Sequence, residues 1–155
     1  MQQDLSSLKI GATLKGDAVI SAEQVQKFAD AVGDMNPVHF SREAAIAAGF
    51  VEGPVVHGDL LPPLANQFLV ERFPGVILKE RRSNWVRPVV VGAKIEMSGI
   101  VIGLERFEGF GHWFLKIICD ISFKSRNKIC ANTNVIALLK MSRSQLDQIV
   151  PRVAA

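Results

Sequence analysis

The feature that most constrains the fold is an abrupt change of hydrophobic pattern near residue 74. Residues 60–73, with the sequence LLPPLANQFLVERF, are apolar on nearly every side of a helix. This pattern predicts a helix buried at the centre of the molecule. Pro62 and Pro63 fit such a helix only in or just after its first turn, where a missing N–H group is tolerated. From residue 76 the hydrophobic period becomes two, which is typical of β-strands.

The second half of the chain predicts long antiparallel strands. Residues 113–123 carry apolar side chains at every second position, and polar residues such as Lys116 and Asp120 alternate with them. Ser125–Lys128 predicts a turn, after which residues 129–139 return in the same style. Long antiparallel strands after an apolar helix predict an α+β fold, in which a curved sheet wraps around the central helix. At 155 residues, the chain is most simply a single domain, residues 1–155.

The first third of the chain begins with a predicted short strand over residues 13–20 and then a helix. Ser21 with Gln24 three residues later makes a capping-box pattern. One apolar stripe follows at helical spacing, formed by Val25, Phe28, Ala29 and Val32. Gly33 is placed to end this helix.

Two further helices are predicted from capping residues. Ser41 can cap a helix in the sequence REAAIAA, and Gly49 can end it. Residues 142–150, which begin SRSQLDQ, predict a short surface helix near the C-terminus.

Composition excludes several classes of function. Hydrophobic residues make up 48% of the chain and charged residues 21%, which is typical of a globular protein. The net charge is only +3, and the basic cluster at residues 79–87 contains Glu80 and lacks the interleaved aromatic side chains of a nucleic-acid platform. We therefore expect no nucleic-acid partner. Cys119 and Cys130 lie in apolar runs, so we interpret them as reduced core residues and expect neither a metal site nor a disulfide.

No apolar run has the length of a signal peptide or a membrane span. We therefore expect a cytoplasmic protein without a membrane span. No segment beyond the predicted elements offers a helix-turn-helix, which a DNA-binding sensor would need.

The loop GDMNPVHF, residues 33–40, carries the first candidate chemistry. Asp34 and His39 can hold one water between them and move its proton, because the imidazole titrates near neutral pH. Pro37 stiffens the loop and favours an extended conformation at Asn36, whose side chain can hydrogen-bond within the loop. Taken alone, this short pattern favours a solvated loop in which Asp34 caps a helix.

The segment VVHGDLL carries the second candidate. Gly58 stands where the buried helix is predicted to begin, so its N–H group can stabilise negative charge on a carbonyl or thioester oxygen. His57 in such a position is more often a structural hydrogen-bonding group than a catalyst. Together the two segments supply an acid–base pair and an oxyanion donor, which is a complete set for chemistry beside a carbonyl.

Residues 28–61, with the sequence FADAVGDMNPVHFSREAAIAAGFVEGPVVHGDLL, closely resemble the signature of the MaoC-like hydratases and dehydratases, the (R)-specific enoyl-CoA hydratase group. The resemblance implies a hot-dog fold and a homodimer with active sites near the interface. It implies reversible addition of water to a trans-2-enoyl thioester, carried by coenzyme A or acyl carrier protein, to give an (R)-3-hydroxyacyl thioester. It implies no metal and no redox cofactor.

The resemblance also assigns roles to residues. Asp34 and His39 fall on the catalytic pair of this group, Gly58 on its oxyanion donor and Asn36 on a supporting loop asparagine. A single water held by the pair would explain syn addition. We further expect His57, Asn66 and Leu69 to contact substrate. For Leu69, packing in the core is an equally good explanation.

Two departures from the family pattern stand after the HG dipeptide. Asp59 replaces the usual methionine, and the next helix contains Pro62-Pro63. We expect Asp59 to cap the helix, the alternative being a side chain that faces the pocket. These departures also keep open a non-catalytic acyl-CoA-binding module. A hot-dog thioesterase is the other alternative, although its carboxylate would come from the central helix without a paired loop histidine.

Other residues have less specific predictions. Trp85 and Trp113 are interpreted as core or dimer-interface residues, and His112 as a turn residue at the start of a strand. A solvated edge face is favoured over contact with coenzyme A phosphates for the basic cluster, which consists of Lys79, Arg81, Arg82 and Arg87.

Overall fold

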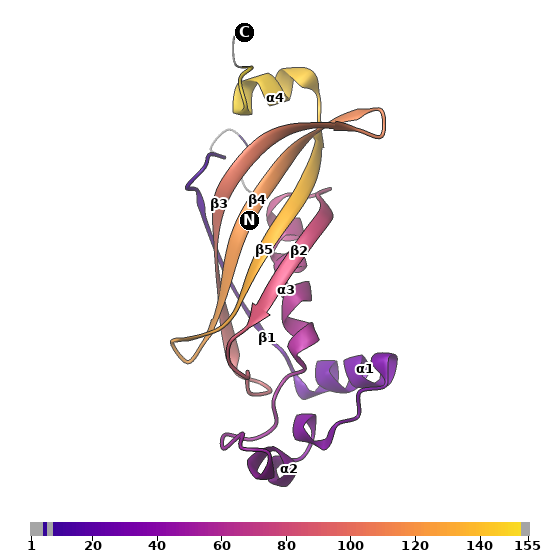
Figure 1. Ribbon diagram of the computed structural model, residues 1–155, viewed down its shortest axis with the longest axis vertical. Helices are drawn as coiled ribbons and strands as arrows, with labels where there is room; N and C mark the ends of the chain where they lie inside the picture. Colours follow the sequence, from indigo (N-terminus) through magenta and orange to yellow (C-terminus); the bar gives the residue numbers. More distant parts are fainter. Residues whose placement is uncertain (1–4, 6–7, 153–155) are drawn as a thin grey trace.

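Within the part of the chain that the structure describes, five antiparallel strands form one curved sheet (Figure 1). The structure is a computed structural model that describes residue 5 and residues 8–152, so both ends of the predicted domain lie outside the described residues. The strand order across the sheet is β1-β3-β4-β5-β2. The strands are β1 (Thr13–Val19), β2 (Ile77–Trp85), β3 (Lys94–Gly109), β4 (His112–Ser125) and β5 (Lys128–Met141). The predicted α+β class and its long antiparallel strands are confirmed.

Four α-helices and two 3-10 turns complete the described elements. They are α1 (Ala22–Val32), η2 (Pro37–His39), α2 (Arg42–Ala47), η3 (Gly58–Leu60), α3 (Leu61–Arg72) and α4 (Arg143–Ile149). The predicted capping box at the start of α1 is present, with Ser21 and Gln24 each bonded to the other's main-chain N–H. The stripe on α1 is shorter than expected: Val25 and Ala29 are buried, whereas Val32 is 57% exposed because only the first two turns of the helix pack against the body.

Helix α3 packs on the sheet through Phe68, which is 1% exposed. Its ring lies against two glycines on neighbouring strands: a Cβ built on Gly16 of β1 or Gly99 of β3 would stand only 3.0–3.1 Å from ring carbons of Phe68. A side chain at either glycine would therefore push the helix away from the sheet. The predicted central helix is confirmed, but it is buried on one side only, because Gln67 and Val70 on its outer side are exposed.

The sheet has an open edge at β2. All nine residues of this strand are exposed, including the apolar Ile77 and Leu78. Strand β2 stands at one end of the sheet and pairs with β5 alone, and β1 forms the opposite edge. Unpaired strand edges of this kind are usually covered or paired in native proteins.

Both cysteines are buried, as predicted. Burial raises the pKa of the Cys119 thiol to about 12, with a smaller contribution from the neighbouring carboxylate of Asp120. The pKa of Cys130 is also raised by burial, so both thiols stay protonated and unreactive at neutral pH. No helix among the described residues is long and apolar enough to cross a membrane.

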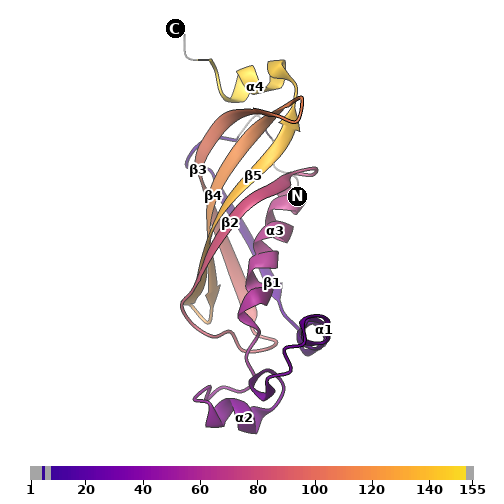
Figure 2. The same cartoon turned by 45° about the vertical axis from the view of Figure 1, so that its right-hand side comes forward.

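The helices are segregated along the sheet (Figures 1 and 2). Helices α1 and α2 and the loop between them lie at the end of the molecule where α3 begins, whereas α4 lies at the opposite end. The loop with residues 33–40 is thereby placed beside the first turn of α3, and the two candidate segments of the sequence meet there.

Candidate active site

Local hydrogen bonds shape the loop between α1 and α2. Gly33 adopts φ = 78° and its N–H donates to Ala29, which ends α1 as predicted. Asn36 is extended (φ −59°, ψ 124°), and its side-chain oxygen accepts from the N–H of Val38 at 3.2 Å. Asp34 does not cap a helix; one of its carboxylate oxygens accepts from the N–H of Asn36 at 3.3 Å. The expected hydrogen bond of the Asn36 side chain within the loop is confirmed.

Three hydrogen bonds tie this loop to the segment before α3. The N–H of Val55 donates to the carbonyl of Val38 (3.1 Å), and the Val55 carbonyl lies 2.7 Å from Nδ1 of His39. Nε2 of His57 lies 3.0 Å from the main-chain carbonyl of Asp34. The two segments that carry the sequence motifs are thus fixed relative to each other.

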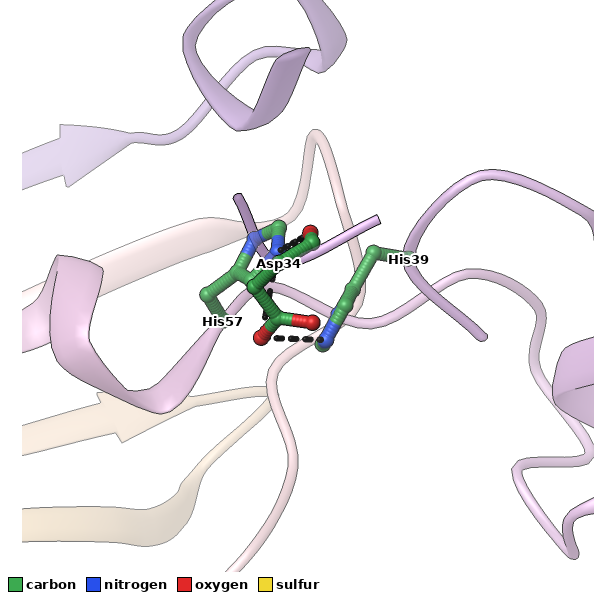
Figure 3. A group of neighbouring side chains, drawn as sticks. All are labelled: Asp34, His39 and His57. Atoms are coloured by element: carbon green, nitrogen blue, oxygen red, sulfur yellow. Dashed lines mark hydrogen bonds and ion pairs between the residues drawn. The ribbon is translucent and has the colours of Figure 1, made fainter. Parts of the chain in front are cut away.

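These bonds assign the protons of His39. Nδ1 must donate to the Val55 carbonyl, so in the neutral imidazole Nε2 carries a free lone pair. Nε2 faces the second carboxylate oxygen of Asp34 at 3.8 Å (Figure 3). Two acceptors at this distance cannot bond to each other, but one water oxygen can lie within hydrogen-bond distance of both. Asp34 is half-exposed and His39 mostly buried, so the carboxylate is open to water on one side only.

His57 lies behind this pair and is only 3% exposed. Its ring stacks on His39 with 3.6 Å between the ring centroids and 24° between the planes. The ring of Phe28, from α1, packs against it at 5.1 Å. Nδ1 of His57 is buried and has no hydrogen-bond partner among the described residues.

Asp34, His39 and His57 are also residue types that bind divalent metals, and their ligand atoms lie within 4.8 Å of one another. The geometry does not suit an ion. The two imidazole planes are almost parallel and 3.6 Å apart, so an ion bonded to both Nε2 atoms would lie well outside each ring plane. Nε2 of His57 is moreover engaged with the Asp34 carbonyl. The arrangement suits a water and its protons better than a metal.

Gly58 begins the 3-10 turn that leads into α3, and it is exposed. Among the described residues no acceptor bonds to its N–H. The indole of Trp85, at the end of β2, covers the glycine: a Cβ built on Gly58 would stand 3.6 Å from two ring atoms. Trp85 is 41% exposed, so its interpretation as a core residue is wrong in the single chain. No local sequence signal marks this contact, because β2 and η3 meet only in the folded sheet.

The expectation that Asp59 caps the central helix is wrong. The residue at the N-cap of α3 is Leu60, and no side chain caps either α3 or the preceding 3-10 turn. The physical reason lies in the 3-10 turn and the prolines. Pro62 has no N–H group, and the N–H of Leu61, the donor that remains for an Asp59 cap, is bonded to the carbonyl of Gly58. Asp59 is exposed in the turn instead.

The other two predicted substrate contacts, Asn66 and Leu69, make no hydrogen bond or ion pair with Asp34 or His39 among the described residues. Asn66 is half-buried on α3, and its side-chain oxygen accepts from Arg81 at 3.4 Å. Leu69 is 1% exposed within the hydrophobic core, which favours the packing alternative. The basic cluster is exposed: Arg82 pairs with Glu80, and Lys79 lies over the ring of Phe107.

A cavity of about 320 Å³ lies between the loop at residues 49–55, the connection from β2 to β3 and the β4–β5 hairpin. Val55, whose carbonyl holds His39, forms part of its wall. Its floor is largely apolar, and its rim carries three cationic side chains, Arg87, Arg126 and Lys128. Arg126 is paired with Glu52 on the same rim.

Two relatives of known activity are similar to this chain in sequence. The mitochondrial 3-hydroxyacyl-[acyl-carrier-protein] dehydratase of Arabidopsis thaliana is 30% identical over 122 residues, which cover 79% of this chain and 71% of that relative. The (R)-specific enoyl-CoA hydratase of Aeromonas caviae is 32% identical over 100 residues, which cover 61% of this chain and 74% of the relative.

The fold agrees as well. The solved structure of the (R)-hydratase from A. caviae involved in PHA biosynthesis matches with a TM-score of 0.71 at 24% identity, over 86% of this chain and 98% of that chain. The sheet wrapped around α3 is therefore the hot-dog fold. Residues 7–110 match the family described as the MaoC like domain. The chain belongs to the MaoC-like hydratase and dehydratase family.

Proposed function

We propose that the protein is a hydro-lyase that reversibly adds water to a trans-2-enoyl thioester and forms an (R)-3-hydroxyacyl thioester. One observation carries the proposal: Nε2 of His39 and a carboxylate oxygen of Asp34 are two acceptors 3.8 Å apart. The N–H of Gly58 lies on the adjoining segment, one residue from the imidazole that stacks on His39. A water between the acceptors and a thioester oxygen at the N–H group would complete the reacting set.

The chemistry follows from the hydrogen bonds. A bridging water donates one hydrogen to Asp34 and the other to His39. Its oxygen then bonds to C3 of the enoyl group while one acceptor takes a proton and delivers it to C2. The electron pair of the double bond moves towards the thioester oxygen, where the N–H of Gly58 stabilises the developing charge. Hydroxyl and proton come from one water, so they add to the same face, and the reverse path is dehydration.

The carrier of the acyl group is anionic in either case, as coenzyme A or as acyl carrier protein. We propose that a phosphate of the carrier arm lies at the cationic rim of the cavity behind Val55. Arg87 and Lys128 are the rim cations for which no carboxylate partner is found among the described residues. We further propose that residues 1–155 act as one domain.

We also propose that the protein is a homodimer. The support is the exposed edge strand β2, together with the exposed outer face of α3. Pairing of two β2 edges would join two sheets and bring Trp85 of each chain near the interface. Light scattering at micromolar concentration tests this proposal, and a clean monomer would contradict it.

The direct test of the activity is the hydration of trans-2-butenoyl-CoA, followed by the loss of ultraviolet absorbance of the conjugated thioester. Chiral analysis of the product should give the (R) enantiomer. Release of free thiol without 3-hydroxyacyl product would favour the thioesterase alternative. Binding of the thioester with no turnover would favour a non-catalytic acyl-CoA-binding module.

A further inference from the structure

His57 contacts both members of the proposed catalytic pair at once. Its Nε2 lies 3.0 Å from the main-chain carbonyl of Asp34, and its ring lies flat against the ring of His39. His57 also directly precedes Gly58 in the chain. Nε2 of His57 also lies 3.7 Å from the carboxylate Oδ2 atom of Asp34. A single side chain thus contacts Asp34 and the imidazole of His39, and it stands next to the oxyanion donor in the chain.

The protonation state of His57 follows from its partners. A carbonyl oxygen only accepts, so Nε2 must carry the hydrogen. Nδ1 is buried and faces no acceptor among the described residues, so a second hydrogen there would be left unbonded. The neutral Nε2–H form of His57 satisfies both conditions, and its one N–H group is used to hold Asp34, whose main-chain carbonyl accepts it.

We propose that His57 is a positioning residue for the water-holding pair, an inference that rests on the proposed function for the role of that pair. Its N–H group holds the main chain of Asp34, and its ring fixes the plane of the His39 ring. The hydrogen bond sets the distance between the carboxylate and Nε2 of His39. The stack keeps Nε2 turned towards the carboxylate, because rotation of the His39 ring is blocked on one face.

The two contacts can be separated by substitution. His57→Gln keeps an N–H donor of similar reach and removes the aromatic stack, whereas His57→Phe keeps a ring of similar shape and removes the donor. Phe28→Leu is the matched control, because Phe28 also packs against the ring of His57 but carries no polar group that could bond to the pair. It should change kcat less than about threefold, since it alters packing alone.

We expect His57→Phe to lower kcat by about 10–100-fold with little change in KM, because a carboxylate displaced by about an ångström no longer shares the water. His57→Gln should recover part of this loss. In an Asp34→Asn background, the additional loss from His57→Phe should shrink to less than about threefold, because the group that His57 holds no longer acts. An equal loss in both backgrounds would overturn the proposal, as would unchanged kcat in His57→Phe.

A readout without substrate separates this inference from the proposed function. The N–H of Asn36 donates to the Asp34 carboxylate, so its hydrogen exchange reports how firmly Asp34 is held. In His57→Phe, exchange at Asn36 should accelerate while amides of the sheet keep their rates, and His57→Gln should restore it. Wild-type protein with no hydratase activity would refute the proposed function alone. Equal exchange at Asn36 in wild type and His57→Phe would refute the role of His57.

Discussion

The site and the core of this protein are held together by different forces. The core joins α3 to the sheet through apolar contacts, with Phe68 seated against glycines on β1 and β3. The site is joined by hydrogen bonds between segments 16 and 23 residues apart, from His39 to Val55 and from His57 to Asp34. Because different forces hold the two regions, we expect activity and stability to be separable. Substitutions in the loop should remove turnover and leave the fold intact, and substitutions under the helix should do the reverse.

The largest effect is expected at the pair. Asp34→Asn and His39→Gln should each lower turnover by about 10²–10⁴-fold, because each removes one partner in proton transfer. The melting temperature should change little, since Asp34 is half-exposed and Gln at position 39 keeps an N–H group that can donate to the Val55 carbonyl. The double variant should be little worse than either single one, because both residues act on one water. A single variant with near wild-type turnover would disprove the assignment of that residue.

The core should show the opposite behaviour. Phe68→Ala should lower the free energy of unfolding by about 3–5 kcal/mol, because it empties a fully buried site. Turnover per folded molecule, measured well below the melting temperature, should stay within a few-fold of wild type. Phe68→Leu is the matched control and should cost less. A loss of turnover as large as that of Asp34→Asn, with the fold intact, would show that the two regions are not separable.

A smaller effect is expected at the glycine beneath this ring. Gly99→Ala should lower the free energy of unfolding by about 1–3 kcal/mol, because the new Cβ would stand 3.1 Å from the Phe68 ring. Chemical denaturation measures this change. In a Phe68→Leu background, Gly99→Ala should lower the free energy of unfolding by less, since the smaller side chain leaves room for the added methyl group. Strict additivity of the two substitutions would mean that another contact sets the cost.

The smallest effect on stability is expected at Asp59, which borders both regions. Asp59→Met should change the free energy of unfolding by less than about 0.5 kcal/mol, because the exposed side chain caps no helix. Turnover of a short enoyl-CoA should be equal or faster, since a negative charge near the developing enolate is removed. Asp59→Asn separates charge from shape. A clear drop in melting temperature for both variants would reinstate a structural role for the carboxylate.

The parts of the site that the sequence predicts are those set by neighbours along the chain. Gly33 ends α1 and Asn36 shapes the loop, because each bond spans four residues or fewer. The contact of Trp85 with Gly58 and the bond from His57 to Asp34 depend on how distant segments meet. Local patterns carry no information on such contacts, so in the sequence only the complementary chemistry of the residues and the resemblance to a known family link the two motifs.

The error at Asp59 and the success with the strands have related causes. Apolar and polar residues alternate over residues 113–123, so the strand prediction rests on many positions and no single residue decides it. Strand β4 is therefore predicted almost to its ends. A cap, in contrast, depends on the position of one boundary. The prediction placed that boundary before Asp59, although the proline pair leaves no N–H groups for a capping side chain after Leu60.

The proline pair also limits which anions the start of α3 can attract. A helix usually presents a cluster of free N–H groups at this end and binds phosphate or carboxylate through several of them. Here Pro62 and Pro63 have no N–H, and the N–H of Leu61 is bonded to the carbonyl of Gly58. Only the N–H groups of Gly58 and Asp59 lack acceptors among the described residues, and the second belongs to a residue that is itself negatively charged. Free phosphate and short carboxylic acids should consequently be poor competitors at this site, leaving it to an oxygen that the rest of the substrate delivers.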